Sequence, residues 1–287
     1  MPGVNAALAL GLPDPAVTDA GGRRWADLRT RTLSAAVLAP VVLACIWFGG
    51  WLWFVLAAFA MAGMMTEWAA MCGTRASKLA SAALLFGGIA GVGSVLEGAR
   101  GQGLVFLLAG GVLTAAVSRR AVLGLAALYI GVPMLCLAAM RGPDAVGRAN
   151  VLFVVAIVWA SDIGAYLTGR LVGGPKLAPA ISPGKTRSGA VGGLVAAMLA
   201  GEAVVMALGG GLSVHAAVAA VVLGVASQAG DLLESWIKRH FGVKDSGWLI
   251  PGHGGLLDRL DGMLAAAVAA TLLMNTGMFG RGGVLWN

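Results

Sequence analysis

Long apolar segments, separated by short polar ones, follow one another from residue 32 to near the end of the chain. They are roughly 17 to 22 residues long, the length that a helix needs to cross the hydrocarbon core of a bilayer. They lack the alternating pattern of a membrane β-barrel. The pattern therefore predicts an all-α polytopic membrane protein with about nine transmembrane helices, over residues 32–49, 51–71, 79–97, 103–118, 121–140, 148–168, 188–208, 212–232 and 256–276.

The composition agrees with this fold class. Hydrophobic residues make up 59% of the chain and charged residues 11%, with a mean hydropathy of +0.86. The three cysteines lie in or beside apolar segments without the spacing of metal ligands, so we interpret them as small buried side chains. No internal repeat is visible, which disfavours transporters built from duplicated halves.

The basic residues indicate the orientation. With a cytoplasmic N-terminus and nine spans, 16 of the 20 Lys and Arg residues lie inside, and the others are Arg100, Arg141, Arg148 and Arg281. A missed span would reverse every later loop, so this bias supports both the number of spans and the orientation. The two most charged loops, 169–187 and 233–255, then face the cytoplasm, where nucleotides are.

We expect three regions: a cytoplasmic tail (1–31), a front transmembrane region (32–147) and a catalytic transmembrane region (148–287) with the two charged loops. The net charge of +7 fits basic cytoplasmic loops and anionic lipid better than nucleic acid, and we expect no nucleic-acid partner. The tail lacks a small-residue cleavage site for a signal peptidase. The chain is expected to be a multi-pass protein of the cell (inner) membrane.

Carboxylates gather at the cytoplasmic ends of the last two predicted spans. Residues three, four and seven apart share a helix face, which groups Asp231, Glu234, Ser235 and Lys238. Asp258 and Asp261 share a face in the same way. Ionisable groups at this depth cost several kcal/mol unless they are paired, ligated or solvated. Converging carboxylates suit a hard cation such as Mg²⁺; the alternative is a set of salt bridges with Lys238, Arg239 and Arg259.

The loop between these acids is rich in glycine and basic residues. Glycines let the backbone approach a ligand and present N–H groups to anions. Lys238, Arg239 and Lys244 are placed to neutralise phosphate oxygens. His253, between glycines, is a hydrogen-bond donor to phosphate, a general acid or a structural contact.

A second polar cluster, residues 181–189, precedes the seventh span and contains Ser182, Lys185, Thr186 and Arg187. It is similar to a phosphate-binding turn at a helix N-terminus, although the Walker A spacing is absent. The alternative is a capped helix start with Ser182 or Ser188 as the cap. Acids within the spans are functional candidates by default; they are Asp162 and, more weakly, Glu67 and Glu202.

The run from Ser235 to Asp261 resembles the signature of the phosphatidate cytidylyltransferases, or CDP-diacylglycerol synthases. That signature reads S-x-[apolar]-K-R-x4-K-D-x-[small]-x2-[apolar]-[P/G]-x-H-G-G-[apolar]-x-D-R-[apolar]-D, and every specified position matches. Residues 162–170 and 182–189 resemble the family's second region, except that Gly184 and Ser188 replace a lysine and a glutamate. The resemblance covers residues 155–275; the front half is similar in hydropathy only.

The resemblance implies that CTP and phosphatidate are converted to CDP-diacylglycerol and pyrophosphate. It implies a two-metal site with Mg²⁺ on Asp231 and Asp258, with Asp261 as a further ligand or its neighbour, and it implies a homodimer. Catalytic roles fall to these acids with Lys238, Lys244 and His253. Substrate-binding roles fall to Ser182, Lys185, Thr186, Arg187, Ser235, Arg239, Arg259 and Asp162.

Two other function classes fit parts of the pattern. A CTP-dependent lipid kinase of the dolichol- or phytol-kinase kind has a similar carboxylate site in a membrane, but it would release CDP and is not expected to carry the complete run. A transporter would place its acids at the midplane rather than at one edge. A CDP-alcohol phosphotransferase is disfavoured because no arginine follows Asp261-Gly262 at the required spacing.

Overall fold

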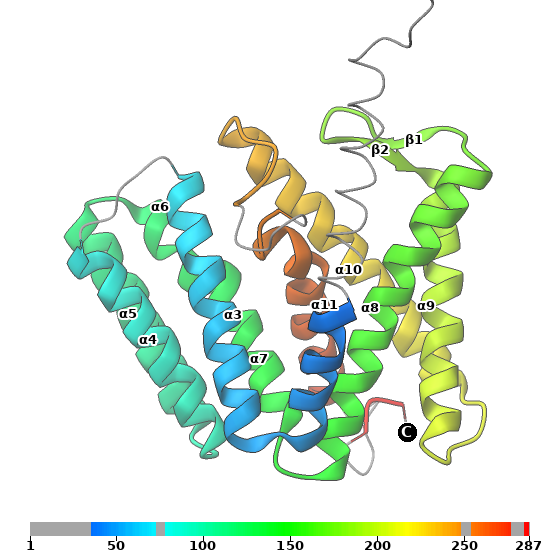
Figure 1. The fold of residues 1–287 in the computed structure, drawn as a ribbon, viewed down its shortest axis with the longest axis horizontal. Coiled ribbons are helices and arrows are strands. Elements are labelled where there is room, and N and C mark those ends of the chain that lie inside the picture. Colours follow the sequence, from blue (N-terminus) through cyan, green and yellow to red (C-terminus); the bar gives the residue numbers. More distant parts are fainter. Residues whose placement is uncertain (1–35, 73–77, 248–253, 277–283, 287) are drawn as a thin grey trace, which may run out of the picture.

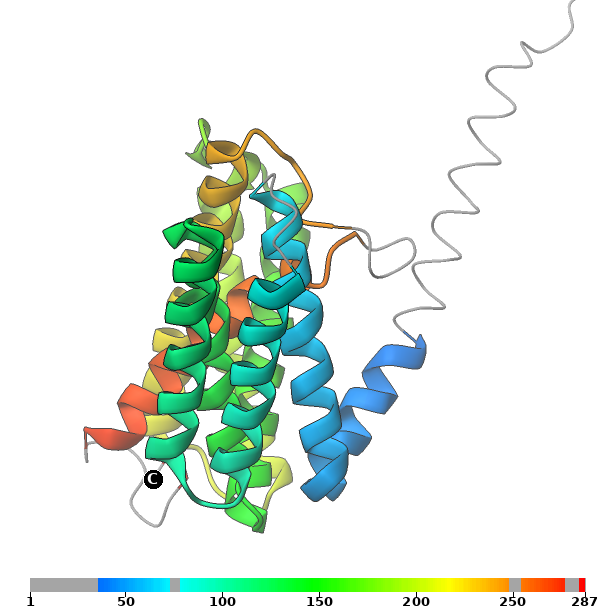
Figure 2. The ribbon, with the colours of Figure 1, turned by 90° about the vertical axis from the view of Figure 1, so that its left-hand side faces the viewer.

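A computed structural model of the chain describes residues 36–72, 78–247, 254–276 and 284–286. Most of these residues are helical, and the long helices run side by side in one bundle (Figure 1). The long helices are α3 (Gly50–Met71), α4 (Lys78–Leu96), α5 (Arg100–Ser118), α8 (Ala145–Leu171), α9 (Arg187–Ala207), α10 (Val214–His240) and α11 (Leu257–Asn275). A shorter helix, Ala36–Phe48, precedes α3 and leans away from the bundle (Figure 2).

The prediction of a polytopic helical membrane protein is confirmed. Within the described residues, seven helical segments are long and apolar enough to cross a membrane. Large apolar side chains on their outer surfaces are exposed, as expected for contact with lipid; examples are Phe59, Phe86, Val112 and Leu199. The first predicted span corresponds to the shorter helix Ala36–Phe48, and the ninth corresponds to α11, which begins with charged residues. The number nine, the orientation and the three-region division stay predictions.

The fifth predicted span is not one regular helix. It consists of α6 (Ala121–Gly124), the π-helix η1 (Ala127–Gly131) and α7 (Val132–Arg141). Pro133 lies in the first turn of α7. Proline has no N–H to donate to the carbonyl one turn earlier, so the regular ladder is interrupted and the wider π turn precedes it.

Helix α10 continues to His240, well beyond the predicted end of the eighth span at residue 232. The charged segment that was predicted to be a loop from residue 233 therefore begins as helix. Lys238 forms an ion pair with Glu234 one turn earlier, at 2.5 Å. The last turn carries three basic residues, Lys238, Arg239 and His240, which interact favourably with the helix C-terminus.

A small hairpin, which was not predicted, connects α8 to α9. Its strands β1 (Lys176–Ala178) and β2 (Ser182–Thr186) are antiparallel, and Lys176 lies opposite Thr186. The hairpin and the C-terminal ends of α3 and α10 lie at the same end of the bundle, the upper end in Figure 1, which we call the site end. Both charged segments thus lie at one end, as the alternation of spans required.

Glycines allow close helix contacts, as expected for membrane bundles. A Cβ atom added at Gly193 of α9 would lie 2.8 Å from the carbonyl oxygen of Ser161 on α8. One added at Gly110 of α5 would lie 2.7 Å from the carbonyl oxygen of Ala83 on α4. At these positions the backbones of neighbouring helices are in direct contact, so any side chain would push them apart.

We predict that Gly110→Ala lowers the stability of the detergent-solubilised protein by about 1–3 kcal/mol, the usual cost of overpacking. Gly101→Ala, on the same helix, is the control because a Cβ atom there meets nothing within 4 Å. That control should be neutral or slightly stabilising, since alanine favours helix more than glycine does. Thermal unfolding measures both; equal melting temperatures would contradict the close contact of α4 with α5.

Candidate functional site

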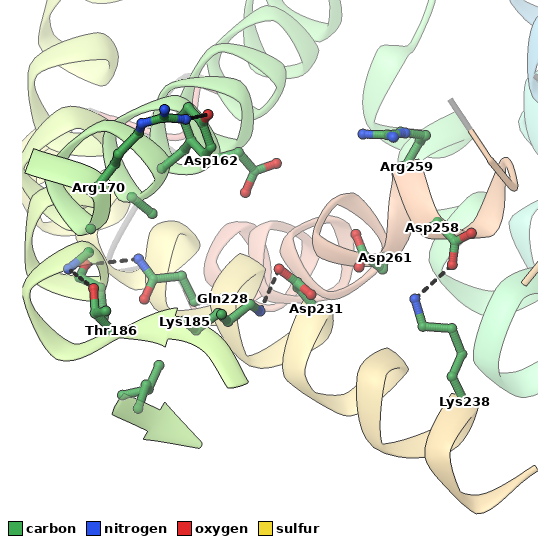
Figure 3. Close-up of a pocket in the computed structure, with 17 residues that line it drawn as sticks. Asp162, Arg170, Lys185, Thr186, Gln228, Asp231, Lys238, Asp258, Arg259 and Asp261 are labelled. Carbon is green, nitrogen blue, oxygen red and sulfur yellow. Dashed lines mark hydrogen bonds and ion pairs between the residues drawn. The ribbon is translucent and has the colours of Figure 1, made fainter. Parts of the chain in front are cut away.

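An open cavity of about 700 Å³ lies at the site end, where α8, α9, α10, α11 and the hairpin meet (Figure 3). Its lining includes eight residues to which the sequence assigned a role: Asp162, Lys185, Thr186, Asp231, Lys238, Asp258, Arg259 and Asp261. The structure therefore brings together the second polar cluster on the hairpin, Asp162 of the sixth predicted span, and both ends of the run from Ser235 to Asp261, with Asp231 just before it. These segments are up to about 100 residues apart in the chain.

Two glycines bring the acids of α10 and α11 together. A Cβ atom added at Gly230 would lie 2.7 Å from the carbonyl oxygen of Asp261 and 3.4 Å from the Cα atom of Gly262. The two helices thus cross at adjacent glycines. Asp231 follows Gly230 and Asp261 precedes Gly262, so the crossing places both carboxylates at one point of the cavity lining.

Lysines compensate the charge of two of these carboxylates (Figure 3). Lys185 Nζ from β2 lies 2.5 Å from Asp231 Oδ2. Lys238 Nζ lies 2.7 Å from Asp258 Oδ1 and also contacts buried Glu234. Of the salt bridges that the sequence offered as the alternative to a metal site, those of Lys238 are present, and Lys185 of the hairpin is a partner that was not expected.

Backbone donors hold Asp258 further. The Ser246 N–H donates to Asp258 Oδ1 at 3.1 Å and to Oδ2 at 3.0 Å, and the Gly255 N–H donates to Oδ2 at 3.1 Å. Three donor groups thus surround one carboxylate, two from the loop and one from the Lys238 side chain. Such an arrangement stabilises the ionised form and fixes the direction in which the carboxylate points.

The second polar cluster forms strand β2 and the start of α9 rather than a simple turn. Thr186 is the N-cap of α9: its Oγ1 accepts a hydrogen bond from the Gly189 N–H at 3.0 Å. The cap is therefore neither Ser182 nor Ser188, and Ser188 instead donates to the carbonyl oxygen of Gly173. Lys185, on the strand, reaches into the cavity beside the first turn of α9.

Several predicted residues are not in the cavity lining: Ser182, Arg187, Ser235, Arg239 and Lys244. Ser235 Oγ lies 3.5 Å from Asp231 Oδ1 and is its neighbour on the helix. Arg187, Arg239 and Lys244 are exposed at the site end, outside the cavity. His253 lies outside the described residues. The roles of these residues stay predictions.

The lining also contains polar residues without an assigned role. Gln228 Nε2 donates to Ala190 O at 3.0 Å and to Ser161 Oγ at 3.3 Å, which ties α10 to α9 and α8. Its position three residues before Asp231 could have revealed it, because both lie on one helix face. Arg170 donates to Tyr166 Oη at 2.8 Å on the opposite wall.

The chemistry of the lining suits a hard cation, since Asp162, Asp231, Asp258 and Asp261 all present carboxylate oxygens. In the part of the chain that the structure describes, no three acidic, histidine or cysteine side chains converge closely enough to hold a metal ion as they stand. Ammonium groups compensate two of the acids instead. The donor set fits Mg²⁺ in its chemistry, provided that Lys185 and Lys238 turn towards another anion.

The family model described as "Cytidylyltransferase family" matches residues 29–276. This chain belongs to the cytidylyltransferase family. The match reaches through the front half, so the expectation that this half is similar in hydropathy only is wrong. Apolar spans outside the site carried too little pattern for that similarity to be seen.

Curated relatives support the same assignment. The phosphatidate cytidylyltransferase of Brucella suis biovar 1 (strain 1330) is 41% identical over 251 residues, which cover 84% of this chain and 91% of the relative. The phosphatidate cytidylyltransferase of Staphylococcus haemolyticus (strain JCSC1435) is 38% identical over 147 residues, or 51% of this chain and 55% of the relative. The first of these alignments extends over most of both proteins.

We predict that Thr186→Ala destabilises the start of α9 by about 1 kcal/mol, the usual cost of losing an N-cap. Thr186→Ser should retain stability, because serine keeps the oxygen that accepts from Gly189. Thermal unfolding of the two variants in detergent is the measurement. Equal destabilisation by alanine and serine would show that the cap contributes little.

Proposed function

We propose that this protein transfers the cytidylyl group of CTP to phosphatidate and forms CDP-diacylglycerol and pyrophosphate. The observation that carries the proposal is the cavity at the site end, where aspartates and lysines converge beside apolar helices. The charged run of the signature supplies one wall and the hairpin supplies the other. Relatives named phosphatidate cytidylyltransferase that match most of the chain support the same activity.

The reaction requires two anionic substrates to meet. An oxygen of the phosphatidate phosphate attacks the α-phosphorus of CTP, and the bond from that phosphorus to the oxygen bridging to the β-phosphate breaks. Pyrophosphate leaves with that electron pair. Little covalent chemistry is required of the protein, so positioning and charge compensation contribute most of the rate.

Lys185 and Lys238 are suited to compensate that charge. Each ammonium group contacts a carboxylate in the cavity wall, 2.5 Å from Asp231 and 2.7 Å from Asp258. Both side chains line the open cavity, so they are free to turn from these carboxylates to the phosphate oxygens of a bound substrate. The carboxylates would keep the lysines charged and directed into the cavity until substrate arrives.

Asp231, Asp258 and Asp261 are the residues that would hold Mg²⁺. When bound, Mg²⁺ neutralises phosphoryl oxygens and so favours attack at phosphorus. The resemblance implies two such ions, and the identity of the second metal stays open. The side chains would then exchange partners, with lysines on phosphate and aspartates on the cation.

The position of the cavity in the helix bundle supports the choice of substrates. The cavity lies at one end of helices whose outer surfaces are apolar, so a lipid head group and a soluble nucleotide could enter from different sides. We infer nine spans in the inner cell membrane, with the cavity on the cytoplasmic side where CTP is available. A homodimer stays a prediction.

Purified protein with CTP, phosphatidate and Mg²⁺ should release pyrophosphate and form CDP-diacylglycerol. Asp231→Asn should lower kcat by at least about 100-fold, because one of the carboxylates that would hold Mg²⁺ is lost. Asp144→Asn is the matched control: Asp144 caps α8 at the opposite end, and asparagine can serve as that cap. Release of CDP instead of pyrophosphate would indicate a lipid kinase, and full activity of Asp231→Asn would contradict the role of this residue.

For the orientation, Lys244→Cys in the exposed loop after α10 should resist a membrane-impermeant maleimide in intact cells. Gly211→Cys, in the loop between α9 and α10 at the other end, should react. The unaltered protein gives the background from its three cysteines. Labelling at position 244 with protection at position 211 would contradict the predicted orientation and indicate the opposite one.

A further inference from the structure

Glu67 lies on α3, in a part of the chain that contributes no side chain to the cavity lining. It is 5% exposed. Among the described residues, no basic side chain forms an ion pair with it. A buried carboxylate of this kind requires compensation from hydrogen-bond donors.

The donors come from the other half of the chain. The N–H groups of Leu256 and Leu257 donate to Glu67 Oε1 and Oε2 at 2.9 and 2.8 Å. Ser246 Oγ donates to Oε2 at 3.4 Å. Residues about 190 positions apart in the chain are thus joined by charge-assisted hydrogen bonds.

These contacts make Glu67 the cap of α11. The residue at the N-cap position of this helix, Leu256, has no side chain that can accept a hydrogen bond. The first N–H groups of a helix lack partners within the helix, and they favour a negative charge. Glu67 supplies both the acceptor and the charge from α3.

The same loop residues hold Asp258. The Ser246 N–H and the Gly255 N–H bind Asp258, while the Ser246 hydroxyl and the adjacent Leu256 N–H bind Glu67. Ser246 and the segment Gly255–Leu256 therefore each donate hydrogen bonds to both carboxylates, Asp258 and Glu67. If Glu67 no longer held the segments, the donors to Asp258 would lose their fixed positions.

The glycines of the loop fit this arrangement. A Cβ atom at Gly247 would lie 2.6 Å from Glu67 Oε1, and one at Gly255 would lie 2.8 Å from the Gly247 N atom. Any side chain at position 247 would displace the Glu67 carboxylate. The glycine at position 247 is thus explained by the approach of α3, and the glycine at position 255 by the close contact of the two loop segments.

We propose that Glu67 is a positioning residue of the site: by capping α11 and holding Ser246, it fixes the loop that orients Asp258. The proposal rests on the proposed function for the activity that it affects. Glu67 itself does not line the cavity, so it acts through the loop and not on substrate. The front half of the chain would then be required for turnover and not merely for membrane insertion.

Glu67→Gln keeps the size of the side chain but removes its charge and one acceptor. We expect kcat to fall about 10- to 100-fold, the usual effect of losing a partner that orients such a group. The KM for phosphatidate should stay within about twofold, because that lipid does not contact Glu67. Without substrate, the amides of Ser246, Leu256 and Leu257 should exchange with deuterium faster, while those of α10 should not.

Glu202→Gln is the matched control, since Glu202 on α9 accepts from the Ser213 N–H at the opposite end of the bundle. A second variant, Gly247→Ala, displaces the carboxylate without altering it and should reproduce the loss of kcat; Gly211→Ala, with open space around it, is its control. Variants are compared at a temperature at which all are folded. Wild-type kcat and exchange in both Glu67→Gln and Gly247→Ala would overturn the positioning role, whereas an inactive wild-type protein would instead overturn the proposed function.

Discussion

Charge compensation of carboxylates at one end of an apolar bundle is the constraint on which this structure depends. Charged groups near the hydrocarbon region are costly unless they are paired or hydrogen-bonded. Asp231, Asp258 and Glu234 meet this requirement through lysines, and Asp258 and Glu67 meet it through backbone N–H groups. The same donors that make these acids tolerable also fix where they point. Stability and chemistry therefore share one set of contacts.

Close helix contacts make this network possible. The crossing of α10 and α11 at Gly230 and Gly262 brings Asp231 and Asp261 to one place. The contact of α8 with α9 at Gly193 places the hairpin, with Lys185, over the opposite wall. Without side chains at these glycines, helix backbones approach closely, and short aspartate side chains from different helices reach the same cavity.

A buried acid in the front half of the chain forms hydrogen bonds to the segments that hold the site. Glu67 connects α3 to the start of α11 and to Ser246, across about 190 residues of sequence. The family match over residues 29–276 agrees with a chain in which both halves belong to one functional unit. A carboxylate that appeared as one weak candidate among intramembrane acids thus occupies a central place in the structure.

The sequence by itself determined the fold class, the segments that form helices and the grouping of chemistry in the charged run. Apolar length and local spacing are properties of neighbouring residues, so pattern was sufficient for them. It also indicated Asp162 and Lys185 as members of the same site as Asp231 and Asp258, through motif resemblance.

Only the tertiary structure decided which partners these residues take. The pairing of Lys185 with Asp231, the cap that Thr186 forms and the hydrogen bonds from the start of α11 to Glu67 depend on how separate helices approach one another. The ion pair of Lys238 with Asp258 likewise joins two separate helices. Contacts between distant segments have no periodicity along the chain, so they become visible only when the helices are packed.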